Sequence, residues 1–445
     1  MGFKGRKRAT TDGLSQRWIA GARNYCAAIN AFVAKGETEG WDAAGPEPSD
    51  GRSTEDAAAV VDIVRRAQGT PEARTLRERF PPGFAILVEQ TNERGRFVGP
   101  IVYVEDDTLI ARVGDPWADT QTWELSASSS VRRDDILIVG RSPKRKVIAV
   151  GGRAGISLSH TWNGETTATL PWPNGSESVP DGVAHEGYEV PSRLDELIPL
   201  DDGRRAVLVA GSGVFLLEQS GATLLCPDEA VLAALLELHA KGDDDKFSIG
   251  LRMQHAAVSP DGSLIAVGAQ DGKHLVLDDR GGVVGRVGPH GEYPHHAVFT
   301  ADGSYLAVNA CHFYNGATVR VATSDLQGMD TEFYAEDPRV AVINSFARVY
   351  ASASRDAELF LGDAYGYLHG VGAGGAPTSK HFVGGNITSM DISPDGRTLA
   401  VATVTGTVHL IELDAGEDPF RIGRSNHLER RRWLMWKGEE RPLCW

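Results

Sequence analysis

The richest group of potential metal ligands in this 445-residue sequence lies between positions 290 and 312. It comprises His290, His295, His296, Cys311 and His312. Imidazole and thiolate bind zinc and other transition metals, so these side chains would form a metal site if the fold gathered them on one face. Their spacing matches no ligand motif, and the interpretation as polar loop residues is favoured. We therefore predict no metal site.

Two other patterns resemble catalytic motifs but fall short of them. His185-Glu186-Gly-Tyr-Glu189 begins like the zinc-protease motif HExxH, but it has Glu in place of the second His and lies among Pro and Gly, which predict a loop. The run Gly268–Lys273 is one residue short of a phosphate-binding GxxxxGK loop and lacks the following Ser or Thr. We predict no catalytic residue, no cofactor and no cofactor-binding residue.

The elements that position these residues follow a repeated pattern. Residues 253–278 contain two short apolar runs on either side of the turn Ser259-Pro260-Asp261-Gly262, followed by a third run. Pro and Gly supply the backbone angles of a tight turn, and alternating apolar residues on both sides predict strands. Copies of this pattern, some of them weak, centre on Pro143, Gly203, Gly303, Gly396 and residues 340–351.

The spacing of these copies predicts a ring of blades. Gly262 and Gly303 lie 41 positions apart, and a period of about 40–45 residues with four strands per unit is typical of β-propellers. We therefore predict an all-β fold, a seven-bladed β-propeller with six blades as the alternative. One blade is predicted from the runs Phe84–Glu89, Phe97–Val104, Thr108–Val113 and Gln121–Ser126.

The two ends of the chain are predicted to differ from the repeats. Apolar spacing predicts helices over 14–35, from Ser53 or Thr54 onward, and from Pro71, with too few apolar residues for a separate core. We expect a helical appendage at 1–79 that packs on a propeller at 80–445, with a helical insertion at 227–241. Residues 430–436 and 442–445 are expected to form two last strands that complete an early blade and so close the ring.

Composition excludes several classes of partner. The net charge of −15 argues against nucleic acid as the main partner, because phosphate binding needs clustered cations. No apolar run is long enough to span a membrane, so no membrane partner is expected. The four cysteines lie far apart and form no pair motif, which favours a reducing cytoplasm.

The repeats resemble those of WD-repeat propellers, although the closing Trp-Asp pair is missing and the opening Gly-His is reduced to His255 and His295-His296. A narrower resemblance rests on two segments. One runs from Val139–Lys146 through Gly155-Ile-Ser and Trp162-Asn-Gly to Leu170-Pro-Trp-Pro173, and the other is Trp433–Trp445. They look like the β-propeller component of bacterial MoxR–vWA–β-propeller systems. The resemblance implies a non-catalytic scaffold that accompanies a MoxR-type AAA+ ATPase and a von Willebrand factor A (vWA) protein.

The same resemblance implies a candidate partner-binding site. A vWA domain holds Mg²⁺ with an incomplete oxygen shell, which a carboxylate of a partner can complete. The acidic run Asp243-Asp244-Asp245 follows the predicted insertion helix and is the candidate donor, with a solvated run of charge as the competing interpretation. Two other functions stay open: a hydrolase or lyase with its site in the central channel, and a small-molecule sensor. Buried groups with shifted pKa values at the channel mouth would favour the enzyme.

Overall fold

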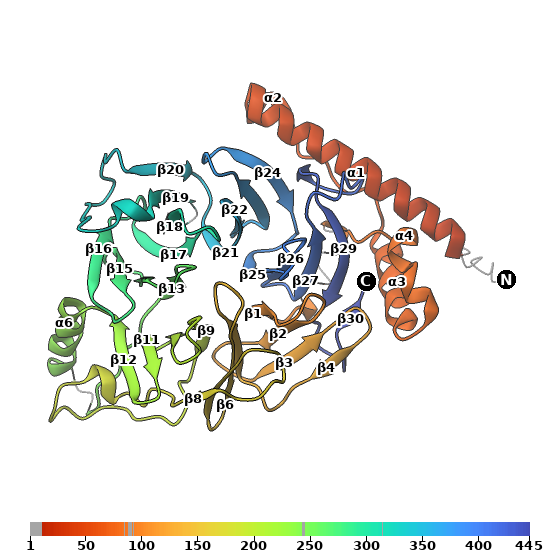
Figure 1. Cartoon of the computed structure of the whole chain (residues 1–445). Coiled ribbons are helices and arrows are strands. Elements are labelled where there is room, and N and C mark those ends of the chain that lie inside the picture. Colours follow the sequence, from red (N-terminus) through yellow and green to blue (C-terminus); the bar gives the residue numbers. More distant parts are fainter. Residues whose placement is uncertain (1–10, 84, 88–90, 92, 243–244, 314) are drawn as a thin grey trace.

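Seven antiparallel sheets arranged around a central axis make up most of the chain (Figure 1). The computed structural model describes residues 11–83, 85–87, 91, 93–242, 245–313 and 315–445. Blade 1 contains β1 (Val98–Tyr103), β2 (Leu109–Gly114), β3 (Thr120–Leu125) and β4 (Ser130–Arg132). Blade 2 contains β5 (Ile138–Arg141), β6 (Ile148–Gly152), β7 (Gly155–Ser159) and β8 (Ala168–Leu170). Blade 3 contains β9 (Leu194–Pro199), β10 (Ala206–Ala210), β11 (Gly213–Glu218) and β12 (Gly221–Cys226).

The remaining blades follow in chain order. Blade 4 contains β13 (His255–Val258), β14 (Leu264–Gly268), β15 (His274–Asp278) and β16 (Val283–Val287). Blade 5 contains β17 (Tyr293–Phe299), β18 (Tyr305–His312), β19 (Asn315–Ala322) and β20 (Val340–Asn344). Blade 6 contains β21 (Val349–Arg355), β22 (Glu358–Asp363), β23 (Tyr367–Val371), β24 (Pro377–Phe382) and β28 (Gly423–Arg424). Blade 7 contains β25 (Ile387–Ile392), β26 (Thr398–Thr403), β27 (Thr407–Glu412), β29 (Leu428–Leu434) and β30 (Leu443–Cys444). The prediction of a seven-bladed propeller is confirmed, and the six-bladed alternative is wrong.

The first strand of each blade faces the channel, and the chain then moves outward through the blade. Turns between the first and second strands lie at one end of the ring, which we call the turn end. Links between blades, and turns between the second and third strands, lie at the other end, which we call the link end. The core lies between neighbouring blades, where Leu208 and Phe215 of blade 3, for example, pack with Ile156 and Leu158 of blade 2.

The turns at the turn end explain the repeated motif. In five blades the N–H of the fourth turn residue donates to the carbonyl of the first, over 2.8 to 3.1 Å. In four of these turns the fourth residue is a glycine with φ between 67° and 76°, a left-handed conformation that glycine adopts without a Cβ clash. These glycines are Gly203, Gly262, Gly303 and Gly396. Blade 2 has Arg145 at the same position, with φ 60°.

The ring closes in a way that differs from the expectation. The late strands β29 and β30 extend blade 7 and do not complete an early blade, so that prediction is wrong. Blade 1 already has four strands of its own, with β4 as the last. The predicted strand Phe84–Glu89 is wrong over Ala85–Leu87, which form a 3₁₀ turn, η2, while residues 84, 88 and 89 lie outside the described part of the chain.

Side-chain contacts to backbone hold the first and last blades together. Ser389 Oγ of β25 accepts from Ile101 N over 3.0 Å, and Asp391 Oδ2 accepts from Tyr103 N over 2.7 Å. Beside them the segment before β1 pairs with the segment after β29, because Arg96 N donates to Met435 O over 3.0 Å. The ring is therefore closed by contacts between two complete blades.

The N-terminal helices pack on the outer edge of blade 7 and beside blade 6 (Figure 1). They are α1 (Thr11–Glu39), α2 (Trp41–Ala44), α3 (Thr54–Ala67), η1 (Pro71–Arg74) and α4 (Leu76–Arg79). The Ser53 side chain caps α3 by accepting from Asp56 N over 3.1 Å, and the predicted apolar stripe of α3 is buried against Trp436 and Trp445. The boundary between residues 79 and 80 stays a prediction.

Two further helical features bear on the predictions. Helix α1 continues past the expected end at Gly36, which is buried because Trp41 packs on it; a Cβ at Gly36 would lie 2.3 Å from the Trp41 ring. Helix α6 (Glu229–Ala240) lies between blades 3 and 4, and the Asp228 carboxylate caps it by accepting from Val231 N over 3.0 Å. Within the described residues, no helix is both long and apolar enough to cross a membrane.

Candidate functional site

The predicted partner-binding aspartates are only partly covered by the structure. Asp243 and Asp244 lie outside the described residues. Asp245 is exposed just after α6. The role of this acidic run therefore stays a hypothesis.

The histidines that could have formed a metal site do not converge. His295 packs edge-on against Tyr350 of blade 6, with ring centroids 4.4 Å apart, and His296 Nε2 lies 2.7 Å from Ser352 Oγ. His312 lies at the surface, with Nδ1 2.7 Å from a carboxylate oxygen of Glu292. Within the part of the chain that the structure describes, no three His, Cys, Asp or Glu side chains are placed to hold a metal ion.

The run His185–Glu189 lies in a loop, as expected. His185 forms an isolated parallel bridge with Phe247, and Glu186 N donates to Phe247 O over 3.1 Å. Tyr188 reaches the Ser212 hydroxyl over 2.9 Å. No helix places His185 and Glu189 on one face, so the geometry of a zinc protease is absent from this described loop.

Histidines of blades 4 and 5 form a group with shifted pKa values, and of these only His274 was not considered in the sequence analysis. Burial lowers the pKa of His255 to about 4, and its Nε2 lies 3.0 Å from Nδ1 of His274, whose pKa burial also lowers well below the usual value. Burial likewise lowers the pKa of His295 and of His296 to about 3. These imidazoles are therefore neutral near pH 7.

One carboxyl on the channel wall is also shifted. Glu196 of β9 keeps some contact with solvent, but the surrounding blades leave it mostly out of bulk water. This desolvation raises its pKa to about 7, and the neighbouring charge of Asp195 adds to the effect. Shifted groups of this kind are the feature that would favour an enzyme, so the channel meets that criterion in part.

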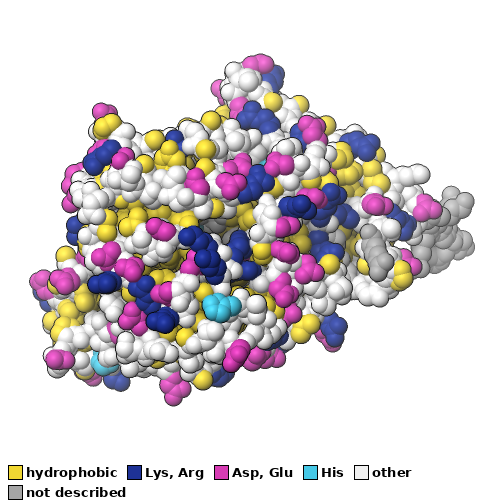
Figure 2. Space-filling model, viewed as in Figure 1, with side chains coloured by type: hydrophobic (Ala, Val, Ile, Leu, Met, Phe, Trp, Pro, Cys, Tyr) yellow, Lys and Arg dark blue, Asp and Glu magenta, His cyan; other side chains and the backbone are white. Residues whose placement is uncertain are grey.

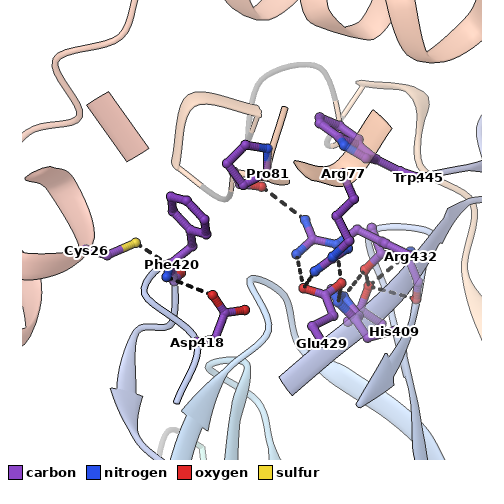
Figure 3. A network of polar contacts seen from close by, with 12 residues as sticks. Cys26, Arg77, Pro81, His409, Asp418, Phe420, Glu429, Arg432 and Trp445 are labelled. Atoms are coloured by element: carbon purple, nitrogen blue, oxygen red, sulfur yellow. Dashed lines mark hydrogen bonds and ion pairs between the residues drawn. The ribbon is translucent and has the colours of Figure 1, made fainter. Parts of the chain in front are cut away.

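A second polar group has the connectivity of a catalytic triad (Figure 3). Thr407 Oγ1 lies 2.8 Å from His409 Nε2, and His409 Nδ1 lies 3.0 Å from Glu429 Oε1. Burial together with Arg432 lowers the pKa of His409 to about 4. Burial alone would raise the pKa of Glu429, but the charges of Arg432 and Arg77 outweigh it and lower that pKa well below its usual value.

This triad-like group has no access to substrate. The exposed fractions of Thr407, His409 and Glu429 are 6%, 1% and 7%. Arg432 donates to both oxygens of Glu429 over 2.8 Å, and Arg77 of α4 adds a third contact. Hydrogen bonds and charges that are satisfied in this way stabilise a buried network, and this one joins β27, β29 and the N-terminal helices.

Exposed aromatic side chains gather at the link end, where blades 5 and 6 meet. The exposed fraction is 61% for Phe313, 79% for Phe346 and 54% for Tyr365. Phe313 and Tyr365 lie in turns between second and third strands, and Phe346 lies in the link between the two blades. We call these three side chains the aromatic surface.

Arg348 connects the three segments that carry the aromatic surface. Its Nη1 donates to Phe313 O over 2.6 Å, and its own carbonyl accepts from Ala364 N, next to Tyr365, over 3.0 Å. Its guanidinium lies over the Tyr350 ring, 5.0 Å from the centroid. The three aromatic side chains are therefore presented from a backbone that Arg348 ties together.

The sequence contained a weak signal for this surface. Phe313 lies close to Asn315-Gly316 and Phe346 follows Asn344-Ser345, and such turn-forming residues predict surface segments where a large apolar side chain has no core to enter. The sequence does not show that Arg348 joins the segments of Phe313 and Phe346. This contact arises because blades 5 and 6 are neighbours in the ring.

Comparisons with known proteins find only distant structural similarity. No protein-family model and no curated protein matches its sequence. Similar solved structures include the β-propeller domain of Cps50 (Swd1) from Myceliophteria thermophila, with 11% identity, a TM-score of 0.43 and coverage of 69% of this chain and 95% of that one. Hydrazine synthase from Kuenenia stuttgartiensis has 13% identity, a TM-score of 0.44 and coverage of 70% and 94%. The computationally designed Ika8 protein has 13% identity, a TM-score of 0.40 and coverage of 71% and 96%. Similarity at this level carries no argument about function.

Proposed function

We propose that this chain is a non-catalytic protein-interaction scaffold that binds a partner through the aromatic surface at the link end. The observation that supports this proposal is the exposure of Phe313, Phe346 and Tyr365 at the link end of the ring. Large aromatic side chains supply much of the binding energy of protein interfaces, and they bind best when the surrounding backbone is already ordered. The Arg348 contacts provide that order here.

The identity of the partner is a finer proposal. The resemblance of Val139–Lys146 and Trp433–Trp445 to the propeller of MoxR–vWA–β-propeller systems names two candidates, a MoxR-type AAA+ ATPase and a vWA protein in the bacterial cytoplasm. In such an assembly the Asp243–Asp245 run would supply a carboxylate to the Mg²⁺ of the vWA domain.

Binding to purified candidate partners tests both the aromatic surface and the identity of the partner. The tagged chain is mixed with the ATPase or the vWA protein, with and without Mg²⁺ and ATP, and the bound fraction is measured. Replacing Phe313, Phe346 and Tyr365 together by Ala should weaken binding at least tenfold. Trp117→Ala, which removes an exposed aromatic at blade 1, is the matched control and should leave binding unchanged. Equal binding by the triple variant and the control would contradict the proposal.

A separate variant tests the role of the acidic run Asp243–Asp245. Replacing Asp243, Asp244 and Asp245 by Asn preserves size and removes charge. If the run completes a Mg²⁺ shell, binding to the vWA protein should lose its dependence on Mg²⁺. Retention of Mg²⁺-dependent binding would reject the role of the run and leave the aromatic surface unaffected.

A hydrolase or lyase in the channel is a second candidate, which rests on the raised pKa of Glu196. A protonated carboxyl near pH 7 can act as a general acid if substrate reaches it. A screen of hydrolase and lyase substrates with the wild type and with Glu196→Gln decides this candidate. Turnover that is lost in the variant would support it, and absence of turnover in both would reject it.

A further inference from the structure

The turn between β5 and β6 departs from its four equivalents in charge and in conformation. The third turn residue is an aspartate in blades 3, 4, 5 and 7, namely Asp202, Asp261, Asp302 and Asp395. In blade 2 it is Lys144, and the next residue is Arg145 in place of glycine. A side chain in the left-handed conformation is disfavoured, so the arginine occupies this position against the preference of the backbone. Strain of this kind is concentrated at functional sites.

The two lysines of this turn have little local compensation. Lys144 and Lys146 are exposed, and neither has a carboxylate within 4 Å among the described residues. The aspartates of the equivalent turns accept backbone N–H groups of their own turns, as Asp261 does from Ser263 N. In blade 2 the counterpart of Ser263 N is Lys146 N, which donates to the Ser142 hydroxyl over 3.0 Å, so the Lys144 side chain has no structural role in the turn.

Arg141 adds a further cation at the end of the innermost strand. Its guanidinium donates only to backbone carbonyls, to Tyr103 O over 2.8 Å and to Arg145 O over 3.3 Å. Its Nε is buried and has no hydrogen-bond partner among the described residues. Burial and the charge of Arg145 lower the pKa of Arg141, as expected for a guanidinium that is not paired with an anion.

Carboxylates near this group limit what it can bind. Arg145 Nη2 lies 2.8 Å from Asp391 Oδ1, which holds the arginine toward the channel from two blades away. The charges of Asp391, Asp106 and Glu105 favour the charged form of Arg141, but they do not outweigh its burial. A single negative charge would gain little here, whereas an anion with several charges could contact more than one of the cations at once.

We propose that Arg141, Lys144, Arg145 and Lys146 form a binding site for a small multivalent anion of the phosphate class at the turn-end mouth of the channel. The planar fork of arginine matches phosphate oxygens, and lysines on a turn add charge without fixed geometry. The space-filling view shows Lys and Arg side chains gathered near the middle of the ring on the face in view, on a chain with a net charge of −15 (Figure 2). This site goes beyond the proposed function, which concerns the opposite end of the ring.

Calorimetric titration with pyrophosphate at constant ionic strength tests the site. We expect one pyrophosphate per chain, and at least tenfold weaker binding in the double variant Lys144→Gln/Lys146→Gln, whose side chains are exposed. Arg145→Gly, which restores the glycine of the equivalent turns, should also weaken binding at least tenfold while the protein stays folded. Arg397→Gln, at the exposed turn of blade 7, is the matched control and should bind as the wild type does.

Several outcomes would overturn the inference. The first is that the wild type does not bind pyrophosphate, and the second is that Arg397→Gln loses as much affinity for pyrophosphate as the lysine variant does. The third is that citrate binds as tightly as pyrophosphate, because this would show a general attraction of anions. Binding of a protein partner at the aromatic surface should not change in the Lys144→Gln/Lys146→Gln variant, so failure of one proposal is distinguishable from failure of the other.

Discussion

Arg77 Nη2 lies 2.9 Å from Glu429 Oε2, and this contact joins the N-terminal helices to the last blade of the ring. Glu429 is buried and also binds Arg432 and His409, so Arg77 is the member of the network that comes from outside the propeller (Figure 3). Trp445 Nε1 supports the same junction by donating to Phe80 O over 2.6 Å. The helices are therefore attached by specific polar contacts as well as by apolar packing.

Replacing Arg77 by Met tests the polar part of this junction. Methionine keeps an unbranched apolar stem but removes the guanidinium, so Glu429 loses one of two arginine partners. We expect a decrease of about 2 kcal/mol in the free energy of unfolding, because a buried carboxylate is left less well compensated. Urea unfolding measures the change. Arg17→Met, which removes an exposed guanidinium paired with Asp56, is the control and should change the free energy of unfolding much less than Arg77→Met does.

Lowering the pH should destabilise this protein at pH values well above the pKa of ordinary carboxyl groups. Burial lowers the pKa values of His255, His381 and His409 to about 4 and those of His295 and His296 to about 3, while in the unfolded chain they lie near 6.5. The unfolded state therefore binds more protons between pH 6.5 and 4, and stability falls as the pH falls through this range. Urea unfolding from pH 7.5 to 4.5 measures it, and stability that rises toward pH 4.5 would contradict the expectation.

The contribution of Glu196 to stability should have the opposite pH dependence. Its pKa is raised to about 7, so the folded state holds a proton that the unfolded state has lost above pH 4.5. Stability from this group is present below pH 4.5 and is lost as the pH rises through 7. Glu196→Gln should therefore raise the melting temperature at pH 8, by an amount equivalent to about 1–3 kcal/mol, with little effect at pH 4.5. An equal change at both pH values would show that Glu196 is not protonated in the folded state.

Gly140 should tolerate no side chain. It lies in β5, and a Cβ there would be 1.7 Å from Leu197 O of β9, so alanine would force blades 2 and 3 apart. We expect Gly140→Ala to destabilise the ring by more than about 3 kcal/mol or to prevent folding. Gly250→Ala is the control, because a Cβ at Gly250 meets no atom within 4 Å. Thermal unfolding of the two variants compares them.

Much of the fold could be predicted from the sequence because it depends on local signals. The turn around Gly262 recurs with a period that only stacked four-stranded units explain, and the helix that follows Ser53 has both a cap and an apolar stripe. The closure of the ring was predicted wrongly. The sequence of β29 and β30 shows that they are strands, but which blade receives them depends on the four strands that blade 1 already has.

The candidate sites were harder to predict because their residues meet across blades. His409 and Glu429 come together through the pairing of β27 with β29, and Arg77 joins them from a helix more than 300 positions away. Arg348 meets Phe313 O only because blades 5 and 6 are neighbours. The turn that carries Arg145 was recognised as a copy without its glycine, but its relation to Arg141 and Asp391 required the three-dimensional arrangement.

Apart from β28, which returns to blade 6, each blade is a contiguous stretch of chain, and no strand is shared between the first blade and the last. A break of the backbone between α6 and β13 would therefore leave every sheet whole, with three blades in one fragment and four in the other. The two fragments would meet again between blades 3 and 4, between blades 7 and 1, and where the N-terminal helices pack on blades 6 and 7. Reassembly of two separately expressed halves would therefore report on the combined strength of these three contacts.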